Sequence, residues 1–248
     1  MEPALQGKTA LVTGAARRIG AAIARRLHAA GANLVLHYRG AEADAGRLET
    51  ELNAARAGSA TTVKGDLLAP IAPQALVSAA LERYRRLDIL VNNASSFYPT
   101  AIGEIEVGHW EELVGSNLRA PLFLAQAAAP HLAKMQGVIV NITDIHAARP
   151  LRGYVVYSIA KAGLAALTRA LALELAPAVR VNAVAPGTIA WPEDGQFEPA
   201  ERERIVAATP LARIGGPKDI AQAVLYLCTA PFVTGQVLAV DGGRSVFS

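Results

Sequence analysis

Short runs of β-branched and aliphatic residues alternate with longer helical patterns along nearly the whole chain. The runs that predict strands are 9–13, 33–37, 60–64, 89–93, 137–142, 179–184 and 237–240. Helical patterns lie at 19–30, 41–57, a stretch ending at Tyr84, 110–117, 118–133, 157–175 and 217–229. Such alternation is typical of βαβ units, in which a helix carries the chain back to a parallel neighbouring strand. The sequence therefore predicts an α/β fold with a doubly wound, seven-stranded parallel sheet and helices on both faces.

Length and composition favour one domain that buries much of its surface. The 248 residues suffice for one large α/β domain, and 52% of them are hydrophobic against 18% charged. No linker divides the chain, so we interpret residues 1–248 as a single domain. The stretch 186–199, rich in Pro, Gly and acidic residues, is expected to be a mobile loop.

The same composition disfavours several classes of protein. The 24 basic against 21 acidic residues give a net charge of +3, too small to indicate a nucleic-acid partner. The single cysteine, Cys228, excludes an internal disulfide and fits a reducing compartment. No apolar segment follows a basic start, and no run approaches the roughly 18 apolar residues of a membrane span. We expect a cytoplasmic protein with no membrane partner and, lacking His/Cys clusters of ligand spacing, no catalytic metal.

Two helical segments, 122–129 and 162–175, are apolar on nearly every side. A helix of that kind is buried all round. The outer helices of a single domain normally keep a polar face, so we expect these two segments to pack against another subunit.

Tyr157 and Lys161 stand four residues apart at the start of an apolar helix, which places them on one face a turn apart. A free phenol, with a pKa of about 10, is a poor acid at neutral pH, but a nearby cation favours the phenolate and lowers that pKa. Asp144 lies on a short loop after an apolar strand. The three groups predict a proton-transfer site where a strand ends and a helix begins.

A glycine-containing turn, Thr13-Gly14-Ala15-Ala16-Arg17-Arg18-Ile19-Gly20, joins the first strand to the first helix. Free backbone N–H groups and the positive end of the helix dipole attract phosphate at such a turn. Gly14 permits the tight turn and Gly20 permits close helix packing. A plain strand-to-helix turn is the alternative, because one glycine pair is a weak signal. Its place in the first βαβ unit favours dinucleotide binding.

The end of the second strand distinguishes between the nicotinamide cofactors. An acidic residue there holds the ribose hydroxyls of the unphosphorylated form, whereas arginine accommodates a 2′-phosphate. Here the chain runs His37-Tyr38-Arg39-Gly40, with no acid before Glu42. Arg39 and Arg17 offer guanidinium groups suited to bidentate phosphate contacts. We therefore expect NADPH as the cofactor.

Six landmarks in this order resemble the short-chain dehydrogenase/reductase superfamily over the whole chain. They are Thr13-Gly14-x5-Gly20, Asp66 after the third strand, Asn92-Asn93-Ala94 after the fourth, Asn117, Tyr157-x3-Lys161 and Pro186-Gly187. The resemblance implies a Rossmann-type domain and, with the apolar helices, a homotetramer.

The resemblance also assigns cofactor contacts. It implies that Asp66 and Leu67 flank the adenine, that Asn93 and Ala94 approach the ribose, and that Pro186-Gly187 abuts the nicotinamide.

The resemblance implies catalytic roles as well. Tyr157 would donate a proton, while Lys161 would hold the nicotinamide ribose and lower the tyrosine pKa. Asn117 would support the lysine through water.

Two departures from the general superfamily pattern narrow this interpretation. Arg18 replaces the glycine in the middle of the phosphate loop, and Asp144 replaces a serine that donates a hydrogen bond to a substrate carbonyl. An ionised carboxylate only accepts hydrogen bonds, which disfavours an alcohol–ketone reaction. Together with Asn93-Ala-Ser-Ser-Phe97-Tyr-Pro99 and the His37-Tyr-Arg39 strand end, these departures resemble the pteridine reductases.

The chemistry of a pterin is consistent with this resemblance. A pterin is a flat, electron-poor heterocycle whose C=N bonds accept hydride at carbon and need a proton at nitrogen. Phe97 offers a stacking face opposite the nicotinamide. The resemblance implies that Arg18 and Ser95 contact the pterin or the cofactor phosphates. Our hypothesis is hydride transfer from NADPH to the pterin, with the proton supplied by Tyr157 or by a water held by Asp144.

Several alternatives stay open on the sequence alone. Trp191 is expected either to close over the substrate or to anchor the surface, and Tyr154, without a lysine four residues on, is interpreted as a loop residue. The chain is alternatively a carbonyl reductase acting on a 3-oxoacyl thioester, which Asp144 disfavours, or an NADPH-binding sensor with little catalysis. The choice among biopterin, monapterin and folate is not decided by the sequence.

Overall fold

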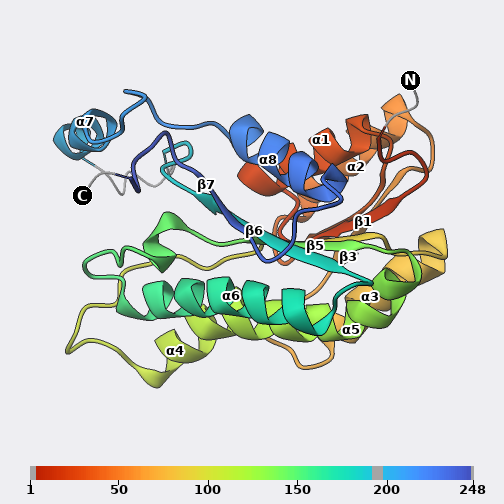
Figure 1. Ribbon diagram of the computed structural model, residues 1–248, viewed down its shortest axis with the longest axis horizontal. Coiled ribbons are helices and arrows are strands. Elements are labelled where there is room, and N and C mark those ends of the chain that lie inside the picture. The colour runs from red at the N-terminus through yellow and green to blue at the C-terminus, as the bar shows by residue number, and fades with distance from the viewer. Residues whose placement is uncertain (1–3, 192–197, 247–248) are drawn as a thin grey trace.

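The computed structural model describes residues 4–191 and 198–246 and shows a seven-stranded sheet between two layers of helices (Figure 1). The strand order is β3-β2-β1-β4-β5-β6-β7, and every neighbouring pair is parallel. The strands are β1 Thr9–Val12, β2 Asn33–Tyr38, β3 Ala60–Lys64, β4 Ile89–Asn92, β5 Val138–Ile142, β6 Arg180–Pro186 and β7 Val237–Val240. The predicted α/β fold with a doubly wound parallel sheet is confirmed.

The helices cover both faces of this sheet (Figure 1). One face carries α1 (Arg18–Ala29), α2 (Glu42–Ala55) and α8 (Pro217–Thr229), and the other carries α3 (Ala72–Tyr84), α5 (Ala120–Lys134) and α6 (Val155–Glu174). The remaining elements are α4 (Val107–Val114), a π-helical turn (Gly115–Arg119), a 3-10 turn (Ile145–Ala147) and α7 (Pro199–Ala207).

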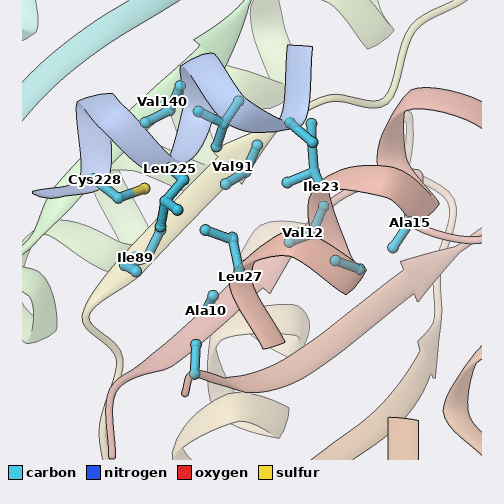
Figure 2. Packing of buried hydrophobic residues seen from close by; sticks show 14 of the residues in the cluster. Ala10, Val12, Ala15, Ile23, Leu27, Ile89, Val91, Val140, Leu225 and Cys228 are labelled. Carbon is cyan, nitrogen blue, oxygen red and sulfur yellow. The ribbon is translucent and has the colours of Figure 1, made fainter. Parts of the chain in front are cut away.

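The alternation of side chains along β1 builds a core on each face of the sheet. Ala10 and Val12 point into the cluster under α1 and α8, which Figure 2 shows, while Leu11 belongs to the cluster on the opposite face. Successive strand residues point to opposite faces, so a strand buried on both sides must be apolar throughout. All four residues of β1 are buried, as this arrangement requires.

The strand order places a crevice beside β1. Val12 lies opposite Leu36 of β2 and Val91 of β4, so the chain leaves β1 toward one side and later returns on the other. The connections after β1 and β4 therefore diverge at their carboxyl ends, which is where open α/β sheets bind ligands.

The helix α7 was not predicted. Four of the nine residues in its sequence, Pro-Ala-Glu-Arg-Glu-Arg-Ile-Val-Ala, are charged and none of the nine is buried, so it lacks the apolar stripe by which a helix is recognised. It begins at Pro199, with Glu198 as its N-cap, and lies beyond the sheet (Figure 1). Of the loop expected at 186–199, residues 192–197 lie outside the described part of the chain.

The expectation that no segment approaches a membrane span needs correction at α6. By length and composition this 20-residue helix is apolar enough to cross a membrane. Half of that stretch is buried within the protein, and Tyr157 and Lys161 lie on its buried side. We interpret α6 as a core helix of the α/β fold.

Candidate active site

A cleft of about 590 Å³ opens where the strands β1, β2, β4, β5 and β6 end. Most residues that the sequence indicates for the site line it: Gly14, Arg17, Arg18, Ile19, His37, Arg39, Asp66, Leu67, Asn93, Ala94, Ser95, Phe97, Asp144, Tyr157, Lys161, Pro186 and Gly187. Of the described residues expected there, Tyr38, Asn117 and Trp191 do not line the cleft.

Asp144, Tyr157 and Lys161 meet at the end of β5. The Tyr157 hydroxyl donates to Asp144 Oδ2 at 2.8 Å, and Asp144 Oδ1 accepts from the His146 backbone N–H at 2.8 Å. Lys161 Nζ donates to the Ile142 carbonyl at 2.9 Å and lies 5.7 Å from the centroid of the Tyr157 ring. The three groups predicted to form a proton-transfer site are therefore brought together.

The structure contradicts the expected direction of the Tyr157 pKa. Burial of the phenol, followed by the charge and hydrogen bond of Asp144, raises the pKa of Tyr157 well above its ordinary value of 10.0. The sequence shows the neighbouring cation, Lys161, but it does not show that the Tyr157 phenol is buried. Burial also lowers the pKa of Lys161 from 10.5 to about 8, with Asp144 opposing that change.

The turn after β1 is shaped for phosphate. Gly14 has a φ of 61°, and a Cβ on Gly20 would lie 2.1 Å from the Gly14 carbonyl oxygen, so only glycine permits this approach. Arg17 at the N-cap of α1 makes no side-chain cap hydrogen bond. The first N–H groups of a helix lack intrahelical partners, so this uncapped end fits the pyrophosphate of a dinucleotide.

Arg18 links the two sides of the cleft. It takes the place of a glycine and keeps the left-handed backbone, with a φ of 49°. Its Nη2 donates to the carbonyl of Ala190 at 3.1 Å, in the segment after β6. A side chain that spans from the phosphate turn to that segment is placed to contact a bound ligand.

His37 anchors the phosphate turn. Its Nδ1 accepts from the Gly14 backbone N–H at 3.2 Å, so the proton lies on Nε2, which donates to the Gly65 carbonyl at 3.1 Å. Burial lowers the pKa of His37, which favours this neutral form. Both nitrogens are engaged with backbone, so His37 supports the cofactor site through the turn that it holds.

The region of the expected 2′-phosphate contains an acid that the sequence analysis missed. Arg39 lines the cleft, but Arg17 pairs with Asp44, which also pairs with Arg47. The hydrogen bond from Arg17, with help from Arg47, lowers the pKa of the Asp44 carboxyl. Asp44 lies in the first turn of α2, soon after the end of β2, but 27 residues separate it from Arg17, so the sequence carries no direct signal of this pair.

Asn93 and its neighbours stiffen the turn from the β4 side. Asn93 Nδ2 donates to the carbonyls of Thr13 and Gly14 at 2.9 and 3.0 Å, and Thr13 Oγ1 accepts from the N–H groups of Asn93 and Ala94. After β3, at the edge of the sheet, Asp66 Oδ1 accepts from the Leu68 N–H at 3.0 Å.

Asn117 lies in the π-helical turn between α4 and α5. Its Oδ1 accepts from Ser95 Oγ at 2.6 Å, and its Nδ2 donates to the carbonyls of Ser96 and Leu113, each at 2.9 Å. Among the described residues no hydrogen bond joins Asn117 to Lys161. The structure shows Asn117 as an anchor for the segment after β4, and its support of Lys161 through water stays a prediction.

Phe97 lines the cleft beside Tyr157. Its ring stacks on Tyr154 with centroids 4.7 Å apart and planes at 14°, and meets Tyr157 edge-on at 4.8 Å and 77°. Tyr154, interpreted from sequence as a loop residue, is the N-cap of α6 and thus joins the aromatic wall. Trp191 lies instead against Arg202 of α7, whose guanidinium is 5.4 Å from its ring centroid.

Other lining residues were also missed. Glu201 and Ile205 reach the cleft from α7, and Arg244, after β7, donates a hydrogen bond to Thr188 Oγ1 beside it. Arg244 follows the carboxyl end of the parallel strand β7, and residues at that position lie at the edge of the sheet where ligands bind. Within residues 4–191 and 198–246, no three His, Cys, Asp or Glu side chains are grouped to hold a metal ion.

Comparisons with known proteins agree with this geometry. Residues 14–245 match the family described as enoyl-(acyl carrier protein) reductase. The chain belongs to the short-chain dehydrogenase/reductase family. It is 40% identical to pteridine reductase 1 of Leishmania tarentolae, over 96% of both chains. It is 38% identical to the granaticin polyketide synthase putative ketoacyl reductase 2 of Streptomyces violaceoruber, over 96% of both chains. The 3-oxoacyl-(acyl-carrier-protein) reductase of Synechocystis is 35% identical, over 98% of this chain and 99% of the relative.

Membership in this family makes the chain an NAD(P)-dependent oxidoreductase, as the sequence landmarks predicted. The relatives include both a pteridine reductase and ketoacyl reductases at similar identity. The substrate class therefore has to be argued from the site.

Proposed function

We propose that this protein is an NADPH-dependent pteridine reductase. The observation that carries the proposal is the pair formed by Asp144 and Tyr157, in which the carboxylate accepts the phenol hydrogen at 2.8 Å. A reductase of ketones needs a hydrogen-bond donor for the substrate oxygen where this chain has an acceptor. A pterin carries N–H and amino groups, and a carboxylate has lone pairs left to accept from them.

The residues of the cleft fit NADPH, which when bound supplies the hydride. The uncapped start of α1 and the glycine turn suit the pyrophosphate, while Arg17 and Arg39 suit the 2′-phosphate. Lys161 is buried beneath the site with its ammonium directed to the end of β5, where it holds the nicotinamide ribose in this proposal.

Tyr157 is the proposed source of the proton that the reduced pterin nitrogen needs, either directly or through a water held by Asp144. Its raised pKa keeps the phenol protonated at neutral pH. The Lys161 ammonium, near the ring, stabilises the phenolate left after transfer. A proton donor placed in this way typically contributes about 10²–10⁴-fold to the rate.

The test follows NADPH oxidation by its absorbance with dihydrobiopterin and dihydrofolate, beside an acetoacetyl thioester and beside NADH. We expect turnover of a pterin with NADPH, little turnover of the thioester, and loss of pterin turnover in Asp144→Ser. If the thioester is reduced faster than the pterins, the protein is a carbonyl reductase, the class to which the names of two relatives point. Cofactor binding without oxidation of any substrate would indicate a sensor.

We also propose that the protein is a cytoplasmic homotetramer. Large apolar side chains remain exposed on the outer sides of α5 and α6, among them Leu122, Phe123, Ile159 and Leu173. Burial of these side chains against other copies of the chain would remove apolar surface from water.

A further inference from the structure

Glu112, on α4, accepts hydrogen bonds from the residues on both sides of Phe97. Ser96 Oγ donates to Glu112 Oε1 at 3.0 Å, and the Tyr98 hydroxyl donates to Glu112 Oε2 at 3.2 Å. Phe97 lies between these two residues and lines the cleft, whereas Glu112 does not. The two oxygens of the Glu112 carboxylate thus bind the two residues that flank Phe97, the proposed stacking residue.

The helix that presents Glu112 is itself fixed to the active site. The next residue, Leu113, is fully buried and packs in one cluster with Val156 and Tyr157. The Leu113 and Ser96 carbonyls accept from the same Asn117 amide nitrogen, each at 2.9 Å. The position of Glu112 relative to Tyr157 is therefore set by packing in the core.

Phe97 needs such support because the residue is 36% exposed. Tyr154 and Tyr157 contact it from the side of α6, and they orient the ring without fixing the backbone that carries it. An exposed aromatic side chain on a segment with rotational freedom loses entropy when it stacks on a ligand. A backbone held in advance reduces that loss.

We infer that Glu112 is a positioning residue that holds Phe97 in place as a wall for a flat ring, and so favours pterins over acyclic carbonyl substrates. The inference rests on the proposed function, since it concerns the pterin end of the same site. Glu112 acts through Ser96 and Tyr98 and touches neither substrate nor cofactor in this role.

The test compares Glu112→Ala and Glu112→Gln with wild type. In Glu112→Ala we expect KM for dihydrobiopterin to rise roughly three- to tenfold, the range of an aromatic pair interaction, with kcat within about twofold. The dissociation constant of NADPH and the low kcat/KM expected for the thioester should stay at wild-type values. Glu112→Gln should be close to wild type, because its amide oxygen accepts from one hydroxyl and its N–H donates to the other.

Glu111→Ala is the matched control, since Glu111 neighbours Glu112 on α4 and, within the described part of the chain, its carboxylate pairs only with Arg119, in an exposed ion pair at 3.8 Å. A double-mutant cycle of Glu112→Ala with Tyr98→Phe should show changes in KM that are less than additive. An unchanged KM in Glu112→Ala, or a parallel loss of melting temperature, NADPH binding and kcat, would overturn the inference alone. Absence of pterin turnover by wild type would overturn the proposed function, and the inference with it.

Discussion

The buried Tyr157 phenol donates a hydrogen bond to the Asp144 carboxylate, and Lys161, one turn away, is buried as well. Desolvation opposes charge on each group, so it raises the pKa of Tyr157 and lowers that of Lys161. The raised pKa favours the protonated, neutral form of Tyr157, and the lowered pKa favours the deprotonated, neutral form of Lys161. Around neutral pH the Tyr157 phenol keeps its proton, whereas the Lys161 amine loses its charge as the pH rises through about 8.

This separation predicts opposite effects of pH on activity and stability. As pH rises through about 8, folded Lys161 loses the ammonium that holds the cofactor ribose, so kcat/KM for NADPH should fall about tenfold per unit. The unfolded chain keeps the Lys161 proton up to its ordinary pKa of 10.5 and so binds more protons than the folded chain in this window. The free energy of unfolding should therefore rise with pH between about 8 and 10.5 relative to Lys161→Met.

The measurements are initial rates and urea unfolding of both proteins from pH 7 to 10.5. Lys161→Met has no group that titrates at this position, so the difference in unfolding free energy isolates Lys161. A difference that stays constant with pH would contradict the lowered pKa.

A second prediction at this scale concerns Asp44, which neutralises Arg17 and Arg47 beside the expected 2′-phosphate. Asp44→Asn removes an anion close to that dianion and frees guanidinium donors. We expect KM for NADPH to fall roughly two- to fivefold, as for an exposed charge pair, while KM for NADH stays unchanged.

Glu42→Gln is the control, because Glu42 lies in the same turn of α2 and pairs only weakly with Lys64 at 3.7 Å. A rise in KM for NADPH in Asp44→Asn would show that Asp44 instead holds Arg17 in a binding orientation.

At the scale of elements, the sequence predicted the strands, helices and turns that leave a pattern of apolar residues or a required glycine. The inner strands β1, β2, β4, β5 and β6 are buried and rich in aliphatic residues, and the turn after β1 needs glycine at positions 14 and 20, so both features were visible in the sequence. The helix α7 was not, because it has no buried face to impose a period. Its two residues in the cleft, Glu201 and Ile205, were missed for the same reason.

The candidate site shows the same limit. The positions of Asp144, Tyr157 and Lys161 follow from their places at a strand end and a helix start, and they were predicted. The direction of the Tyr157 pKa was wrong because it depends on burial, which no local pattern reports. The contacts of Asp44 and Glu112 were missed because each joins residues that are separated along the chain. Asp44, on α2, pairs with Arg17, and Glu112, on α4, binds the segment after β4.

At the scale of the whole molecule, α5 and α6 help to cover one face of the sheet (Figure 1). Both helices still carry exposed apolar side chains. Phe123 is 41% exposed on α5 and Ile159 is 47% exposed on α6. A carboxylate at such a position would have to be desolvated in an interface. Phe123→Asp should therefore convert the proposed homotetramer into smaller species without changing the fold of the subunit.

Light scattering measures the mass, and circular dichroism reports whether the subunit remains folded. Ile71→Asp is the control, because Ile71 is also an exposed apolar residue but caps the start of α3, outside α5 and α6. A tetramer in wild type and in Ile71→Asp, with dissociation in Phe123→Asp, would place the interface on α5. A monomer in wild type would refute the assembly, and the exposed side chains of α5 and α6 would then need another partner.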